Sequence, residues 1–247
     1  MKTDYRKYKM KKKEIIACIT VCSVIVSLIS ILFYNSLFPC VFLYPCEIFF
    51  IKLHAGYLRQ KRQRKLRLEF KEMIEALAAN MSAGYSLETA FHYVYEEMSG
   101  IYKGESDIEK ELLIIKKGIQ LNNSIELLLE DFGLRSGVSD IKEFAEVIAV
   151  AKKTGGNIVK IIKKTSENIR RKQEVESEIA TMVAAKKMEQ RIMSMMPCCI
   201  VLYMRIANKG YMNTLYGNAA GIFIMTTCLL VMIGAICWGR RIVDIEV

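Results

Sequence analysis

Apolar positions are spaced along the chain in two ways. Four stretches are almost wholly apolar, and between the second and the third lies a long block in which apolar residues recur every three or four positions. An apolar run of roughly 20 residues can cross a bilayer as a helix, whereas the three-to-four spacing predicts an amphipathic helix that buries one face. The pattern therefore predicts membrane segments near both ends of the chain and a helical block between them.

The central block, residues 59–190, has no strand-like alternation and contains no proline. Its apolar residues fall into successive single stripes, each typical of a helix with one buried face. The stripes are Leu66, Phe70, Met73, Ile74, Leu77 and Met81; Leu87, Ala90, Phe91, Val94 and Met98; Ile108, Leu112, Ile115 and Ile119; Ile125, Leu128, Leu129 and Phe132; Ile141, Phe144, Ala145, Ile148 and Ala151; and Ile158, Ile161, Ile162, Thr165 and Ile169. About six such helices predict an antiparallel bundle.

Two breaks between these helices have the same composition. Gly84 is placed to end one helix and Ser86 to cap the next, while Gly155-Gly156 and Asn157 follow the same order later in the chain. Residues 76–91 can be aligned with residues 146–162 on this basis. The alignment is compatible with an internal repeat, and equally with the general likeness of any two helical hairpins.

The other breaks are polar. We expect loops at residues 99–107 and 133–137, and a helix start at Asn123, which with Glu126 resembles a capping box.

The stretch from Ser139 to Pro197 connects the two kinds of segment. A helix beginning at Ser139-Asp140 ends at Gly155-Gly156, and Asn157 begins the next. No Gly or Pro then occurs before Pro197, by which point the sequence is apolar. We therefore expect one helix to run from the central block into a membrane segment, with Gly155-Gly156 as a bend and Pro197 as a kink.

The four apolar stretches predict two membrane hairpins. The first joins spans at about 15–33 and 37–53, and the second joins spans at about 192–207 and 218–238. The second span is the least regular, because it contains Pro39, Pro45, Glu47 and Lys52.

The distribution of Lys and Arg orients these hairpins. The formal net charge is +10, and the basic residues concentrate in residues 1–14, in the central block and in the tail 239–247. Cytoplasmic segments of membrane proteins carry such an excess. The sequence thus predicts an all-α, multi-pass integral membrane protein, with two transmembrane hairpins flanking a cytoplasmic antiparallel bundle and with both termini cytoplasmic.

Glu47 is the only carboxylate within an apolar run. It can be interpreted as an intramembrane ion or partner site, or as a residue near the cytoplasmic face that pairs with Lys52. An enzyme or a small-solute transporter centred on Glu47 therefore remains an alternative function.

The sequence lacks other signatures of chemistry. It has no phosphate-binding loop, and His54 and His92 have no ligand or nucleophile at helical spacing. The eight cysteines lie in or beside apolar runs and form no C-x-x-C motif. We expect no catalytic residues, no cofactor and no metal site.

A basic surface is expected on the long helix, at Lys160, Lys163, Lys164, Arg170 and Arg171. It can be a solvated face with pairs such as Glu167–Arg171, or a docking face for an acidic partner or for lipid headgroups. No aromatic residues are interleaved with these charges, so nucleic acid is not an expected partner.

Residues 66–205 resemble the F-domain family of type II secretion, and within it the Tad-type (TadB- or TadC-like) platform proteins. The resemblance rests on Leu77, the segment Ala83-Gly84-Tyr85-Ser86-Leu87 with Ala90, the break Gly155-Gly156-Asn157, Ile169-Arg170, and the run from Ala184-Ala185 to Pro197. The order of parts, with a helical domain between two membrane hairpins, is also similar.

The resemblance implies a function that the residues alone do not. Such proteins are non-catalytic inner-membrane platforms that are thought to couple a cytoplasmic hexameric secretion ATPase to pilus assembly or protein export. Expected partners are that ATPase, other platform subunits, pilin-like subunits and the lipid bilayer. The resemblance leaves the TadB-like, TadC-like and sporulation-associated branches open, and a passive membrane-anchored scaffold remains an alternative.

Overall fold

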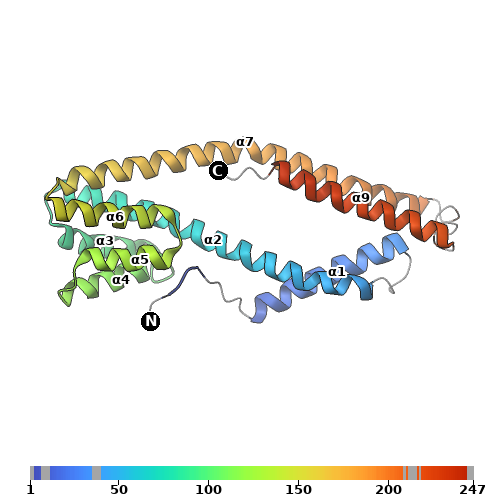
Figure 1. The fold of residues 1–247 in the computed structure, drawn as a ribbon, viewed down its shortest axis with the longest axis horizontal. Coiled ribbons are helices and arrows are strands. Elements are labelled where there is room, and N and C mark those ends of the chain that lie inside the picture. Colours follow the sequence, from blue (N-terminus) through green and yellow to red (C-terminus); the bar gives the residue numbers. More distant parts are fainter. Residues whose placement is uncertain are drawn as a thin grey trace. The chain divides into compact units, whose positions relative to one another are not determined.

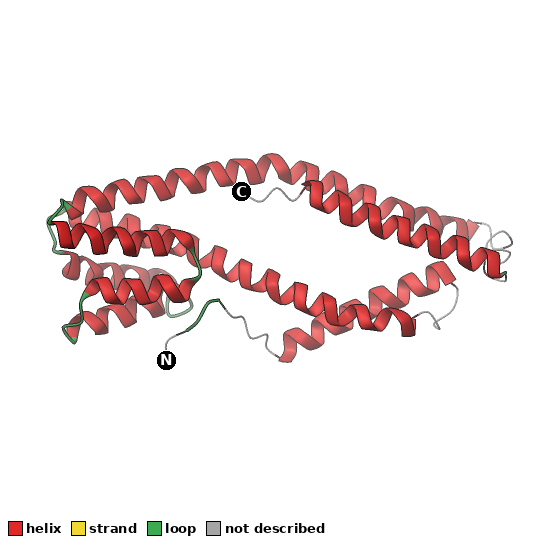
Figure 2. Ribbon diagram, in the orientation of Figure 1, coloured by secondary structure: helices red, strands yellow, loops and turns green. Residues whose placement is uncertain are grey.

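The computed structural model describes residues 3–6, 12–34, 40–207, 210, 216 and 218–243; within these, the side chains of 12–14, 40–53, 219, 240 and 243 are not described. All regular elements in these ranges are α-helices (Figures 1 and 2). They are α1 (Lys12–Tyr34), α2 (Cys40–Ser82), α3 (Leu87–Tyr102), α4 (Asp107–Gln120), α5 (Ile125–Ser136), α6 (Ser139–Thr154), α7 (Ile158–Ala207) and α9 (Ala219–Val243).

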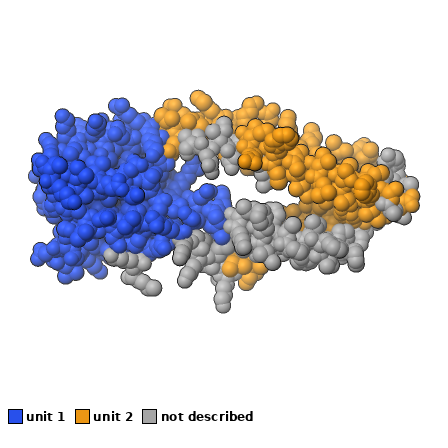
Figure 3. All heavy atoms as spheres, in the orientation of Figure 1, with its two compact units in different colours: residues 1–9, 55–174 blue, residues 10–54, 175–247 orange. Residues whose placement is uncertain are grey.

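The chain forms two compact units, shown in different colours in Figure 3. The bundle unit comprises residues 1–9 and 55–174, and the apolar unit comprises residues 10–54 and 175–247. Helices α2 and α7 each contribute one end to each unit.

The bundle unit is built on the predicted stripes. All six stripe residues of α2 and all five of α3 are buried, as are most of those on α4 to α7. Phe70 lies at the centre of the core, with its ring edge-to-face against Phe132 at 6.3 Å and Phe144 at 5.6 Å between centroids. Aromatic pairs prefer this geometry because the positive ring edge meets the negative ring face. Most of the stripe residues predicted for this region therefore lie in one hydrophobic core.

The turns at Gly84 and Gly155 are built alike. Gly84 has φ +99° and Gly155 φ +66°, both in the left-handed region that suits glycine. The residue after each glycine donates its N–H back to a carbonyl of the preceding helix, from Tyr85 to Asn80 at 3.4 Å and from Gly156 to Ala151 at 3.1 Å. Both bonds have the six-to-one pattern of a Schellman motif.

The helix that follows each turn also begins in the same way. The Thr89 N–H donates to Ser86 Oγ at 3.3 Å, and the Lys160 N–H donates to Asn157 Oδ1 at 3.0 Å. The predicted caps at Ser86 and Asn157 are therefore confirmed. The shared construction is compatible with an internal repeat and equally with the general likeness of helical hairpins, because many helices end in this motif.

Three of the expected breaks are placed differently. Helix α3 continues to Tyr102, so the loop expected at 99–107 is shorter. The cap before α5 is Ser124, without a side-chain bond, so the capping box expected at Asn123 is wrong. Helix α5 also continues through most of the loop expected at 133–137.

The loop prediction failed at Gly133 because this glycine serves packing. A Cβ at this position would lie 3.1 Å from Lys142 Cα in α6. The missing side chain allows α5 and α6 to approach closely, and only the left-handed Gly137 (φ +66°) ends the helix.

In the apolar unit, α1 packs on α9 through Leu32 and Phe33 against Met225 and Leu229. The Tyr34 and Thr226 hydroxyl oxygens lie 2.9 Å apart, and Tyr216 donates its hydroxyl to the Leu32 carbonyl at 2.7 Å. Most other apolar side chains of these helices are exposed, as expected for surfaces that face lipid.

Two helices in the described residues are long and apolar enough to cross a membrane, Ile15–Tyr34 and Ala220–Gly239. They coincide with the predicted spans at 15–33 and 218–238. The predicted spans at 37–53 and 192–207 are not among them, although residues 40–53 and 192–207 are helical. Charges at Glu47 and Lys52, and at Arg205, lower the hydropathy of these two stretches. The hairpin arrangement therefore stays a prediction.

Candidate functional site

The turn between α6 and α7 is fixed by its backbone. No atom lies within 4 Å of a Cβ built on Gly155, so the positive φ alone requires glycine there. A Cβ on Gly156 would lie 3.5 Å from Ile161 Cδ1, an ordinary contact, and φ at Gly156 is not positive. The two adjacent glycines thus have different roles, and only Gly155 needs its conformational freedom.

Beyond this turn, α7 has one face on the bundle and one toward solvent. Ile162, Ser166 and Ile169 are buried in the bundle unit. The five residues predicted as a docking face, Lys160, Lys163, Lys164, Arg170 and Arg171, are all exposed. Arg170 Nε lies 3.9 Å from Glu174 Oε1, a distant pair that leaves the surface basic. The structure therefore presents the predicted basic residues together along the outer side of one helix.

Asp140 holds α7 to the bundle. Its carboxylate, 1% exposed, accepts a hydrogen bond from Lys172 Nζ of α7 at 2.8 Å and a second from Arg67 Nε of α2. Gln173 Nε2 adds a bond to the Arg67 carbonyl at 3.3 Å. Burial alone would raise the pKa of the Asp140 carboxyl, but the bonds from Lys172 and Arg67 and their charges lower it below its ordinary value.

The N-terminal segment is also part of the bundle unit. The Tyr5 N–H donates to the Arg135 carbonyl at 3.0 Å, and its hydroxyl donates to Glu111 Oε1 at 3.0 Å. The Tyr5 side chain is 2% exposed, with the Arg62 guanidinium 4.8 Å from the ring centroid. Burial, followed by the nearby carboxylates of Glu111 and Asp107, raises the Tyr5 pKa above its ordinary range. Residues 3–6 are therefore docked on helices α2, α4 and α5.

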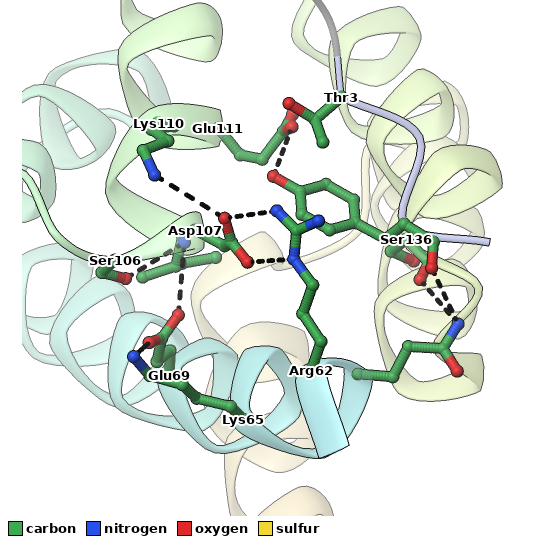
Figure 4. A network of polar contacts seen from close by, with 12 residues as sticks. Thr3, Arg62, Lys65, Glu69, Ser106, Asp107, Lys110, Glu111 and Ser136 are labelled. Atoms are coloured by element: carbon green, nitrogen blue, oxygen red, sulfur yellow. Dashed lines mark hydrogen bonds and ion pairs between the residues drawn. The ribbon is translucent and has the colours of Figure 1, made fainter. Parts of the chain in front are cut away.

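In this polar cluster, Glu111 of α4 accepts bonds from both Tyr5 and Arg135; Figure 4 shows it near Arg62 and Asp107. Arg135 binds its two carboxylate oxygens at 2.8 and 2.6 Å, and Arg135 Nε also lies 2.9 Å from Asp131 Oδ2. The Glu111 side chain is 1% exposed, so these partners replace the water contacts that the carboxylate loses on burial. The hydrogen bonds that Arg135 donates to Glu111 raise the pKa of the guanidinium above its already high ordinary value.

Asp107 joins α4 to α2 in the same cluster. Arg62 donates to it from Nε at 2.6 Å and from Nη2 at 2.8 Å, and Lys110 Nζ lies 3.8 Å away (Figure 4). Burial raises the Asp107 pKa, but the bonds and charge of Arg62, with Lys110 and Lys65, outweigh burial and lower it. These ion pairs connect helices, and none is arranged around an open site.

Sequence reasoning did not find this cluster. Arg62 belongs to a basic run that we interpreted as a topology signal, and Tyr5 lies among the basic residues of the N-terminus. The Asp131–Arg135 and Asp107–Lys110 pairs have helical spacing that the sequence displays. The contacts of Glu111 with Tyr5 and Arg135, and of Arg62 with Asp107, join residues 24 to 106 positions apart, which no local pattern reports.

The remaining predicted residues are dispersed. Gly84 lies at the α2–α3 turn, and Pro197 lies within α7, in the apolar unit, with an exposed side chain. The side chain of Glu47 lies outside the described residues. The structure thus brings together Gly155, Gly156, Asn157 and the basic residues of α7 in the bundle unit, whereas Pro197 belongs to the apolar unit.

Among the residues that the structure describes, no group of three or more His, Cys, Asp or Glu side chains could hold a metal ion. The buried carboxylates described above are each paired with Arg or Lys from another helix. Such pairs fix the relative positions of helices.

A helical bundle connected through two long helices to apolar helices that are long enough to cross a bilayer is the architecture of a membrane protein. The model of the family "Type II secretion system (T2SS), protein F" matches residues 73–204, which is more than half of the chain. The chain belongs to this family. Its members are structural platform proteins of inner-membrane secretion and type IV pilus-like systems, and they are not enzymes. No curated protein and no solved structure matched the chain significantly.

Proposed function

We propose that this protein is a non-catalytic platform of a Tad-type pilus or secretion machine. In this proposal a cytoplasmic hexameric ATPase docks on the bundle unit, and α2 and α7 transmit its movement to the membrane. Pilin-like subunits and further platform subunits then assemble around the membrane helices.

The main observation that supports the proposal is the length of α7. It runs without a break for 50 residues, from a buried start at Ile162 in the bundle to Ala207 in the apolar unit. An α-helix resists compression because each turn is hydrogen-bonded to the next. Helix α2 supports the same interpretation, since its 43 residues also belong to both units.

Helix continuity can be tested at Ala184, which is exposed and lies in α7 beyond the bundle unit. Ala184→Pro removes one backbone hydrogen bond and clashes with the preceding turn, at a cost of about 3 kcal/mol. We expect pilus assembly or secretion in the native host to be lost, while the protein stays in the membrane fraction with a protease-resistant bundle.

Ala184→Ser is the matched control, because it changes the same exposed position without breaking the helix. Normal assembly by Ala184→Pro would contradict force transmission through α7. A passive scaffold predicts that outcome.

The basic face of α7 supports the choice of an acidic protein surface as partner. Reversing Lys160, Lys163 and Lys164 to Glu should abolish co-purification with the ATPase, because complementary charge then becomes repulsion. The wild-type complex should weaken as salt concentration rises.

Lys103, Lys117 and Lys142 are exposed elsewhere on the bundle unit and provide three control reversals of equal charge. Equal binding by both triple variants would show that docking uses another face. Glu47→Gln separates the platform from the transporter or enzyme alternative, because a platform should tolerate it.

A further inference from the structure

Residues 3–6 occupy a socket on the bundle unit, with walls from α2, α4 and α5. The Tyr5 hydroxyl donates to Glu111 Oε1 of α4 at 3.0 Å, and the Arg62 guanidinium of α2 lies 4.8 Å from the centroid of the Tyr5 ring. Tyr5 is 2% exposed, whereas the residues on either side of it are exposed. One aromatic side chain therefore anchors the segment.

The backbone of the segment is held as well. Arg135 Nη1 of α5 donates to the Thr3 carbonyl at 3.0 Å and to Glu111 Oε1 at 2.8 Å, so Thr3 lies beside Glu111 (Figure 4). The Arg135 carbonyl accepts the Tyr5 N–H at 3.0 Å. In other sites that bind an extended peptide, main-chain bonds likewise hold the segment and a side-chain pocket selects the residue.

The charged groups of the socket are paired without Tyr5. Arg135 binds both carboxylate oxygens of Glu111, and Arg62 makes two hydrogen bonds to Asp107. These ion pairs join helices of the bundle to one another and use no atom of the docked segment. Loss of the Tyr5 side chain should therefore release the segment and leave the ion pairs in place.

The docked segment continues into the first membrane helix. Only residues 7–11 separate it from Lys12, where α1 begins, and α1 contains the stretch Ile15–Tyr34 that is long enough to cross a bilayer. The six peptide links from Arg6 to Lys12 cover at most roughly 20 Å when fully extended. A segment that is bound to the bundle at one end and joined to α1 at the other limits how far the two can separate.

We propose that residues 3–6 are a tether that fastens the first membrane helix to the bundle, with Tyr5 as its anchor in the socket of Arg62, Glu111 and Arg135. This inference rests on the proposed platform function, to which it adds a third connection beside α2 and α7. The two helices transmit movement, and the tether limits its extent.

Hydrogen exchange of the full chain in lipid nanodiscs tests the anchor. The Tyr5 N–H should be protected in the wild type. Tyr5→Phe removes the hydrogen bond to the Glu111 carboxylate and should speed exchange at this amide by roughly tenfold. Tyr5→Ala should abolish the protection, whereas Tyr93→Ala, at an exposed tyrosine of α3, should keep it. Unprotected exchange in the wild type, or full protection in Tyr5→Ala, would overturn the proposal.

Lengthening the connection distinguishes a tether from a contact that only stabilises the bundle. A Gly/Ser insertion of about 12 residues directly after Lys9 adds up to roughly 40 Å of reach and leaves residues 3–6 free to dock. The same insertion directly after Lys2 is the matched control, because it precedes the docked segment and leaves the connection to α1 unchanged. Both variants should keep the protection of the Tyr5 N–H.

Spin labels at Ile16→Cys in α1 and Lys117→Cys in α4, with the native cysteines replaced by alanine, report the separation by double electron–electron resonance. The insertion after Lys9 should broaden the distance distribution and, in the native host, abolish pilus assembly or secretion; the insertion after Lys2 should do neither. An unchanged distribution, or normal assembly despite a broader one, would overturn the tether. Failure of the proposed function would appear differently, as normal assembly in a host that lacks this protein.

Discussion

Gly155 and Gly156 are neighbours in the sequence that differ in what the backbone requires of them. Gly155 adopts φ +66° with open space around it, whereas Gly156 has no positive φ. The left-handed conformation costs an L-residue roughly 1–2 kcal/mol. From the sequence we predicted the pair as one hinge. In the structure only the first glycine, Gly155, needs the left-handed conformation.

Gly155→Ala should therefore lower the stability of the detergent-solubilised protein by about 1 kcal/mol, while Gly156→Ala should be close to neutral. Thermal unfolding followed by circular dichroism measures the difference. Equal effects of the two substitutions would show that the turn is not held in the left-handed form.

Asp140 connects three helices through a carboxylate that is 1% exposed. Its pKa is lower in the folded protein than the ordinary value of 3.8, so folding favours the ionised form. The stabilisation is present above about pH 4 and is lost as the pH falls through the lowered folded value. The pKa of Asp107 is also lower in the folded protein than its ordinary value, so its contribution to stability is likewise lost at acidic pH.

Asp140→Asn should destabilise the protein at pH 7 by about 2–4 kcal/mol, because Arg67 and Lys172 lose a charged acceptor. Its melting temperature should fall less steeply than that of the wild type between pH 5 and pH 3. Glu143→Gln, at an exposed position of the same helix, is the control and should keep the wild-type profile. An unchanged profile for Asp140→Asn would remove the carboxylate from the acid response.

The Glu111–Arg135 pair provides a test of how much a buried ion pair contributes to stability. Glu111→Gln should cost about 3 kcal/mol, because the largely buried Arg135 loses its two-oxygen partner and keeps only Asp131 as a counter-charge. Glu111→Leu/Arg135→Met should cost less than the two single substitutions added together. Glu146→Gln breaks the exposed pair with Lys142 and should change stability by no more than about 0.5 kcal/mol.

Among the elements, α5 and α6 show how a glycine can support a helix contact. Gly133 lies in α5 against the backbone of Lys142, whereas Gly100 lies in α3 with no neighbouring atom within 4 Å of a Cβ. Gly133→Ala should destabilise the bundle by about 1–3 kcal/mol, since the helices must separate. Gly100→Ala should stabilise it by about 0.5–1 kcal/mol, because alanine favours a helix. Chemical denaturation of both variants measures the two signs.

The sequence predicted two separate parts of helix α2 but not that they form one helix. The sequence indicated an apolar stretch at 37–53 and a stripe beginning at Leu66, with a basic run between them. The structure makes residues 40–82 one helix, which continues through Pro45 and Gly56 and through the basic run. Two continuous helices, α2 and α7, therefore belong to both units.

For the whole molecule, the predicted topology places both termini and the bundle in the cytoplasm. The docking of residues 3–6 on the bundle unit requires these two parts to lie on the same side of the membrane. Green fluorescent protein fused to the C-terminus should fluoresce, because that end is predicted to be cytoplasmic. Alkaline phosphatase is active only outside the cytoplasm, so phosphatase inserted at residues 35–36 or 209–217 should be active. Inactive phosphatase at both turns would contradict four crossings.

The sequence by itself determined the helical class, the stripes of the bundle, the glycine caps and the continuity of α7. Each depends on residues at most a few turns apart, where the periodicity of a helix is visible. Only the tertiary structure decided that Tyr5 is buried against Glu111, that Asp140 receives two cations, and that Gly133 is a contact rather than a loop. These depend on which helices meet, and that is set by packing between residues far apart in the chain.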